Sequence, residues 1–219
     1  MKDLKRASTA VLVLYYILTL ASAVWCLSRE PALYNILLVL SALALPAVPW
    51  VLYRLLRWER VPMLEIVFHV FCFFAVGFAS LLGGYDLIPI WDKLLHFFSG
   101  FLFAALGLVV YYACKPGREI EPREAPIPAL FAWMFAVLSA VVWEIFEYVV
   151  SFFGPDPQKV AETGIHDTMG DMIVCFLGGL ITGIACLRYV RSAGKARPRG
   201  FMMRLFSEIY EINLRPKEK

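Results

Sequence analysis

The chain has 219 residues, of which 60% are hydrophobic and only 18% are charged. Its mean hydropathy of +0.68 excludes an ordinary soluble domain, in which about half of the residues are apolar and a quarter are charged. The net charge of +3 gives no separate support to nucleic-acid binding, because membrane topology accounts for the distribution of the basic residues.

Six apolar stretches follow one another along the chain, and each has about the 20 residues that a helix needs to cross a bilayer. They are Ala10–Leu27, Ala32–Tyr53, Val61–Leu82, Leu94–Cys114, Ile127–Phe153 and Met169–Tyr189. The sequence therefore predicts an all-α polytopic membrane protein with six transmembrane helices.

The basic residues predict which side of the membrane each connection faces. With the N-terminus inside, 18 of the 21 Lys and Arg residues fall on the cytoplasmic side. Only Arg29, Lys93 and Lys159 then face outward. Since cytoplasmic loops carry an excess of Lys and Arg, we expect a plasma-membrane protein whose two termini are both cytoplasmic.

The second and third stretches carry features that are unusual in a membrane span. Pro46 and Pro49 predict a kink in the inner half of the second stretch, because proline cannot donate a helical hydrogen bond. Glu65 and His69 lie four residues apart on one face of the third stretch, near its inner end. This pair is either a structural contact or part of a proton path.

The sixth stretch and the tail complete the predicted architecture. Three glycines in the sixth stretch, at positions 178, 179 and 183, indicate the close approach of a neighbouring helix. Residues 191–219 form a basic cytoplasmic tail that follows a membrane domain of residues 1–190. Within the tail, Phe201–Leu214 has apolar residues at helical spacing. It predicts an amphipathic helix that either lies on the anionic inner leaflet or packs against the bundle.

Polar side chains gather near the outer ends of the last three stretches. Each stretch carries a pair three or four residues apart, and so on one helical face: Asp92 and His96, Glu144 and Glu147, and Asp167 and Asp171. If the three helices touch, these side chains converge on one shallow cavity that opens to the outside.

A charge at membrane depth costs on the order of 2.5–3.5 kcal/mol even on lenient insertion scales, so these acids need a neutralising partner. A divalent cation would supply one directly, because oxygen ligands suit Mg²⁺, Mn²⁺ or Ca²⁺ and the added imidazole of His96 favours Mn²⁺, Fe²⁺ or Zn²⁺. The candidate metal ligands are Asp92, His96, Glu144, Asp167 and Asp171. Shared protons or Lys93 are the alternative source of neutralisation.

Plainer interpretations exist for several of these residues. Asp92 and Asp167 are well placed to cap the helices that they begin, and His166 is more typical of a surface residue. Glu147 would serve only as an interhelical partner in this interpretation. Glu144 lies too deep for a cap. The coincidence of three polar pairs at one depth is what favours a functional site.

The ordered motifs resemble those of the VanZ-like superfamily. They are Asp92-Lys93-x-x-His96-Phe97, the later Glu144, and Asp167-x-x-x-Asp171 followed by Gly178. The Trp-Glu-x-x-Glu and Asp-Thr-x-x-Asp forms are closer to the YjdF-like (DUF2238) membrane proteins than to VanZ itself, where Glu-x-x-Gln and a terminal Asn are typical. The resemblance implies a bacterial or archaeal cell-envelope protein and supplies no reaction.

Three functions fit these observations. The first is a metal-assisted hydrolase or transferase that uses Mn²⁺, Zn²⁺ or Mg²⁺ and acts on a membrane lipid or lipid-linked phosphate. In it, His96, Glu144 and Glu147 are the catalytic candidates, with Glu147 as general base or orienting group. The second is a proton- or cation-coupled transporter with Glu65 and His69 as its inner relay. The third is a non-catalytic protein whose polar site binds a metal or lipid.

Overall fold

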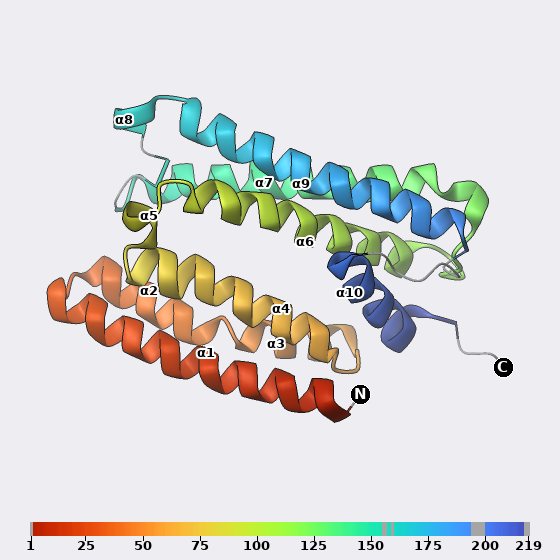
Figure 1. Ribbon diagram of the computed structural model, residues 1–219, viewed down its shortest axis with the longest axis horizontal. Helices are drawn as coiled ribbons and strands as arrows, with labels where there is room; N and C mark the ends of the chain where they lie inside the picture. The colour runs from red at the N-terminus through yellow and green to blue at the C-terminus, as the bar shows by residue number, and fades with distance from the viewer. Residues whose placement is uncertain (1, 155–156, 159, 194–199, 217–219) are drawn as a thin grey trace. The chain divides into compact units, whose positions relative to one another are not determined.

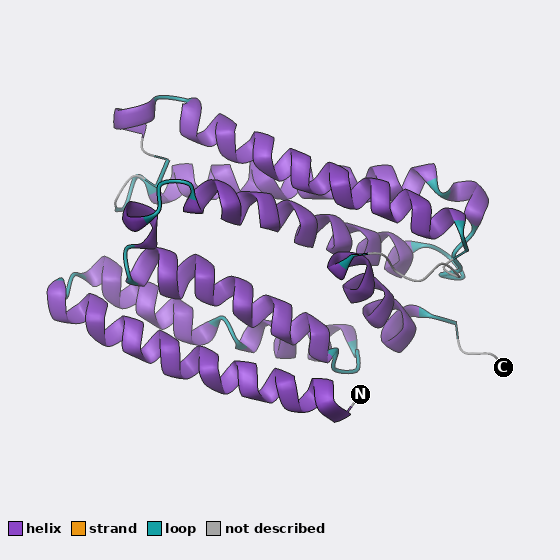
Figure 2. Cartoon of the chain, in the orientation of Figure 1, coloured by secondary structure: helices purple, strands orange, loops and turns teal. Residues whose placement is uncertain are grey.

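The structure is a computed structural model that describes residues 2–154, 157–158, 160–193 and 200–216. Within these ranges the chain is built of helices joined by short loops, without strands (Figures 1 and 2). The predicted all-α fold is confirmed. The expectations for Lys159 and for the basic residues at 194–199 and 217–219 lie outside the described residues.

Five of the described helices are long and apolar enough to cross a membrane. They are α1 (Lys2–Arg29), α4 with its continuation η1 (Pro62–Leu81), α6 (Trp91–Cys114), α7 (Pro126–Val150) and α9 (His166–Arg191). A sixth span results if α2 (Leu33–Ala44) and α3 (Ala47–Leu56), which meet at a bend of 51°, are taken as one. The number and positions of the apolar spans match the expectation, whereas the sidedness of the termini stays a prediction.

The bend between α2 and α3 confirms the predicted kink and has a local cause. Pro46 has no N–H, so the carbonyl of Ala42, four residues earlier, loses its helical donor. The hydroxyl of Tyr15 in α1 donates to that carbonyl at 2.6 Å. The side chain from α1 therefore satisfies a backbone group that the proline leaves open inside an apolar span.

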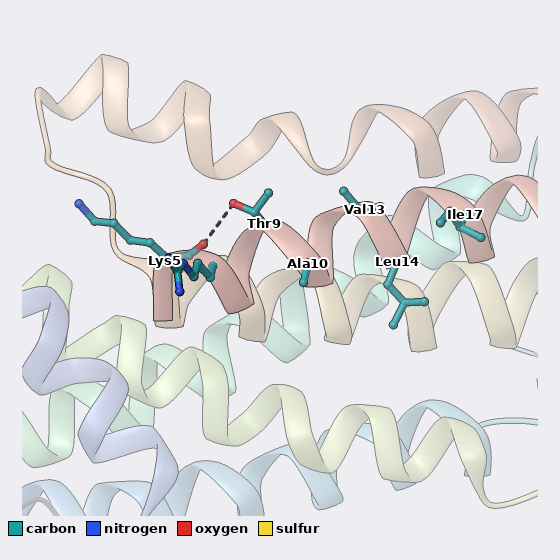
Figure 3. Close-up of a pocket in the computed structure, with 7 residues that line it drawn as sticks. Lys5, Thr9, Ala10, Val13, Leu14 and Ile17 are labelled. Atoms are coloured by element: carbon teal, nitrogen blue, oxygen red, sulfur yellow. Dashed lines mark hydrogen bonds between the residues drawn. The ribbon is translucent and has the colours of Figure 1, made fainter. Parts of the chain in front are cut away.

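The chain divides into two compact units, Met1–Asp92 and Lys93–Lys219, each described here by itself. In the first unit α1 packs along α4 and η1 (Phe73–Leu81), a π-helical segment, and the short α5 (Gly84–Leu87) follows. α1 bears a shallow groove lined by Lys5, Arg6 and the exposed side chains of Val13, Leu14 and Ile17. Figure 3 shows Lys5 near the start of the helix and the three apolar side chains farther along it. A cationic end on an apolar face is typical of a helix that meets lipid near the headgroups.

The second unit is centred on α6, α7 and α9, which pack through small residues. A Cβ on Gly100 of α6 would lie 2.2 Å from the Cys175 carbonyl oxygen of α9, and one on Gly178 would lie 2.2 Å from the Phe97 carbonyl oxygen. The two backbones are therefore in direct contact, and only glycine fits at these positions. This confirms the expectation that the glycines of the last span admit a neighbouring helix.

The tail forms the helix α10 (Phe201–Ile209), which continues as the π-turn η3 (Tyr210–Leu214). The ring of Phe206 lies 5.8 Å from both Tyr112 and Tyr189 at the ends of α6 and α9. The Tyr210 hydroxyl donates to the Arg118 carbonyl at 2.7 Å, and burial, with Glu211 nearby, raises the pKa of this phenol. Of the two alternatives for this helix, the structure favours packing against the bundle.

The predicted boundary between a membrane domain of residues 1–190 and a tail of residues 191–219 stays a prediction.

Three short elements complete the second unit: η2 (Pro122–Glu124) in the loop after α6, α8 (Val160–Thr163) before α9, and the tail helix itself. The loop after α6 is held by Lys115, whose ammonium group pairs with Glu121 at 3.0 Å and Glu124 at 2.6 Å.

Candidate metal centre

The glycine contacts set the register of the three central helices. Lys93 and Ser99 of α6 lie beside Asp167 and Cys175 of α9. The order is the same along both helices, so α6 and α9 run in the same direction. α7 lies between α6 and α9 in the chain and runs antiparallel to both. All the predicted site residues lie toward the end at which α6 and α9 begin and α7 finishes. The packing that forms the core thus also brings the polar pairs to one level.

Asp92, His96 and Asp171 form the closest group at this level. Each offers a ligand atom, and these atoms all lie within 4.8 Å of one another. His96 is 7% exposed and Asp171 only 2%, whereas Asp92 is half-buried. Asp92 and His96 are one turn apart on α6, and Asp171 is brought to them by the close contact of α6 with α9. One imidazole and two carboxylates can hold a divalent ion.

Lys93 connects the two acids of α9. Its ammonium group donates to Asp167 Oδ1 at 2.6 Å and to Asp171 Oδ2 at 2.9 Å, as well as to the Asp167 carbonyl at 3.2 Å. The other carboxylate oxygen of Asp171, Oδ1, lies 3.8 Å from His96 Nε2. Asp171 therefore stands between a cation on one side and the imidazole on the other.

Asp167 does not act as a helix cap. The residue at the N-cap position of α9 is Ile165, which makes no side-chain capping bond, and the Asp167 carboxylate pairs with Lys93 instead. His166 is exposed, as the plainer interpretation of this residue expects. The carboxylates of α9 thus face α6, and its first histidine does not.

Glu144 lies on the bundle-facing side of α7. It continues a buried stripe of alanines at four-residue intervals: Ala132, Ala136 and Ala140. Ala136 contacts Gly179 of α9. Glu144 is eight residues, or about 12 Å, farther along α7, and Asp171 is eight residues back along α9. The buried Glu144 and Asp171 therefore lie at about the same height.

Glu144 is held by a residue that the sequence did not identify. The Gln158 side chain, from the connection between α7 and α9, donates to Glu144 Oε2 at 3.0 Å and to the Glu144 carbonyl at 3.1 Å. Gln158 is only 6% exposed. Loop residues have no periodic pattern, so nothing in the sequence indicates this contact. Glu144 is not one of the three residues in the close group.

Glu147, on α7, is not part of the close group. It is half-buried, and its Oε1 accepts a hydrogen bond from the exposed Trp143 indole at 2.9 Å. The structure therefore assembles three of the predicted ligands directly, links Asp167 to them through Lys93, and places Glu144 at their level. The role of each in binding or catalysis stays a prediction.

The family described as "Predicted membrane protein (DUF2238)" matches residues 8–192 of the chain. An "Uncharacterized protein" of Thermotoga maritima is 28% identical over 130 residues, which are 59% of this chain and 65% of the relative. The chain thus matches slightly less than two thirds of that relative's length. No solved structure matches.

Proposed function

The chain belongs to the DUF2238 family of membrane proteins, and we propose that it is a metal-dependent hydrolase or transferase whose ion is held by Asp92, His96 and Asp171. The observation that supports this proposal is the group of three ligand atoms within 4.8 Å of one another at membrane depth. Buried carboxylates are costly in an apolar medium unless a cation neutralises them. Lys93 brings one positive charge to the carboxylates of Asp167 and Asp171, and with Asp92 beside them a divalent ion would balance the charge that remains.

The donor set favours particular metals. One imidazole nitrogen with carboxylate oxygens suits Mn²⁺ or Zn²⁺ better than Mg²⁺, which prefers oxygen ligands alone. Asp171 would use Oδ1, because Oδ2 is engaged by Lys93. Three protein ligands leave coordination positions for water and substrate, as is usual in catalytic sites.

The surroundings of the group favour a phosphate-bearing substrate. Lys93 places an ammonium group beside the ligands, and lysine is a common partner of phosphate oxygens. The site lies toward the end of the spans, where lipid headgroups reside. We therefore expect a lipid-linked phosphate, with Lys93 exchanging an aspartate contact for the phosphate.

Glu144 supplies the acid–base chemistry in this proposal. Gln158 donates to one of its carboxylate oxygens and so fixes the group near the level of Asp171. The ion would lower the pKa of a water in the site, and Glu144 would accept the proton of that water as its oxygen forms a bond to phosphorus. The bond from phosphorus to the lipid oxygen would break at the same centre, and the lipid oxygen would take up a proton.

The experiment is an assay of phosphate release from lipid-linked phosphates by protein purified in detergent and supplemented with Mn²⁺ or Zn²⁺. Asp171→Asn and His96→Ala should lower the rate at least about 100-fold, as is typical when metal chemistry is lost. His166→Ala is the matched control, because this exposed histidine should leave the rate unchanged. Equal rates in all four proteins would contradict the proposal.

A proton- or cation-coupled carrier is the second candidate, because the first unit buries Glu65 and His69 within a span. Reconstituted vesicles that pass an ion down its gradient in a Glu65-dependent manner, without phosphate release, would favour it. Stoichiometric metal with neither turnover nor flux would favour the non-catalytic alternative.

A further inference from the structure

α1 and α4 pack side by side in the first unit (Figure 1), and both helices carry buried polar side chains, which we call the polar seam. We define it by the four residues Ser8 and Tyr15 of α1 and Glu65 and His69 of α4. All are less than 10% exposed, although both helices belong to membrane spans. The polar side of each helix is thus turned inward, against the other.

Glu65 connects this seam to water. The Arg60 guanidinium binds both carboxylate oxygens of Glu65, at 2.9 and 2.8 Å, and the Ser8 hydroxyl donates to the same carboxylate. The Arg60 side chain is 65% exposed, whereas that of Glu65 is 7% exposed. The carboxylate is therefore buried but linked to a solvated cation at the end of the span that the basic residues place in the cytoplasm.

His69 lies one turn deeper than Glu65. It is 3% exposed, and neither ring nitrogen meets hydrogen-bond geometry with the rest of the described chain. The ring lies beside Tyr15, with centroids 5.9 Å apart, and within reach of the Pro46 carbonyl dipole at the bend between α2 and α3. A buried imidazole that is bonded this weakly keeps a ring nitrogen that can take up a proton.

We propose that His69 is a proton-binding site filled from the side of the membrane on which Arg60 lies. A proton from water passes by way of the Glu65 carboxylate to a ring nitrogen of His69, and the imidazole becomes an imidazolium. The Glu65 charge and the Pro46 carbonyl dipole both stabilise this cation. No other bond forms or breaks.

The groups around His69 decide how its protonation responds to change. Glu65 and Cys72 share its helix, Tyr15 faces it from α1, and Arg60 acts through Glu65. The Tyr15 hydroxyl is engaged by the Ala42 carbonyl. The bend contributes a backbone carbonyl. Among the charged groups around the ring, Glu65 therefore favours the imidazolium and Arg60 opposes it.

The site also adjoins the break in a membrane span. Interrupted spans form many ion sites in transporters, where freed backbone groups line the site. A cationic ring would attract the Pro46 carbonyl more strongly than a neutral one. The proposal does not depend on the metal centre, which is built from other residues.

The test is solution NMR of protein in detergent with ¹⁵N-labelled histidine. The chain has only three histidines, and His69→Gln assigns the His69 signals by their loss. We expect those signals to titrate with bulk pH. Glu65→Gln should move the titration midpoint to lower pH, because it removes the negative charge that stabilises the imidazolium. Arg60→Gln should move it to higher pH, because it removes a positive charge that repels the imidazolium. Tyr15→Phe should leave the midpoint nearly unchanged.

The opposed shifts distinguish a proton site from a packing role. His69 signals that stay constant from about pH 4 to pH 9 would overturn the proposal. A shift of the same sign in Glu65→Gln and Arg60→Gln would also overturn it. Size-exclusion profiles and circular dichroism that match the wild type confirm that the variants compared are folded.

Discussion

Lys93 decides the charge balance of the outer site at the scale of single residues. Its ammonium group lies between Asp167 and Asp171, two acids one turn apart on α9. The depth and spacing of Asp92, His96 and Asp171 in the sequence identify them as candidate site residues, because charged residues inside a span are rare. The sequence does not show which carboxylates pair with Lys93, because the pairing depends on how α6 and α9 are rotated about their axes.

Lys93→Met should destabilise the protein, because it leaves Asp167 and Asp171 without their shared cation. Breaking a buried pair costs about 3–5 kcal/mol, and we expect the lower end because Lys93 is partly exposed. Thermal unfolding in detergent measures the effect. Adding Asp167→Asn should restore part of the loss. A double variant less stable than Lys93→Met would contradict the assigned pairing.

A second prediction at this scale concerns Tyr15. Tyr15→Phe should cost about 1–3 kcal/mol, because the Ala42 carbonyl is left unsatisfied in an apolar span. In the Pro46→Ala background the same change should cost little, since an alanine N–H can donate to that carbonyl. Unfolding free energies of the four proteins in this double-mutant cycle measure the coupling. Additive effects would show that the tyrosine does not compensate for the proline.

Helix pairing is the feature that matters at the scale of elements. Gly100 and Gly178 bring α6 and α9 into backbone contact, and this contact carries Asp171 to His96. The sequence predicts the role of the α9 glycines, because close helix approach requires small residues. It does not predict the π-helical course of Phe73–Leu81, because an i to i+5 hydrogen-bond pattern has no distinct signature in an apolar run.

Gly178→Ala should both destabilise the protein and disrupt the outer site. Its Cβ would lie 2.2 Å from the Phe97 carbonyl oxygen, and overpacking of this kind costs about 1–3 kcal/mol or more. Gly170→Ala in the same helix is the control. Its Cβ would meet only the flexible Lys93 side chain, at 3.0 Å, and alanine favours the helix. Equal stability of the two variants would contradict the backbone contact.

Hydropathy predicts the membrane spans of the molecule well, but it does not predict the contacts that its loops make. Six apolar stretches and the proline kink follow from helix length and backbone chemistry. The division into units near Asp92 and the contact of Gln158 with Glu144 depend on tertiary packing. They involve no repeating pattern in the chain, so sequence reasoning had nothing from which to infer them.

The distribution of basic residues makes a testable prediction about which side of the membrane each loop faces. Ser28 and Cys114 are both exposed, each at the C-terminal end of its span, and the basic residues place Ser28 outside and Cys114 inside. In a Cys26→Ser background, a membrane-impermeant maleimide should label Ser28→Cys on intact cells and Cys114 only after permeabilisation. Labelling of Cys114 on intact cells would reverse the topology.

Elemental mass spectrometry of the purified, metal-supplemented protein would show whether Asp92, His96 and Asp171 hold an ion. We expect close to one Mn²⁺ or Zn²⁺ per chain in the wild type and in His166→Ala, and almost none in Asp171→Asn. A metal-free wild type, or an Asp171→Asn variant that keeps its ion, would contradict a metal centre at Asp92, His96 and Asp171.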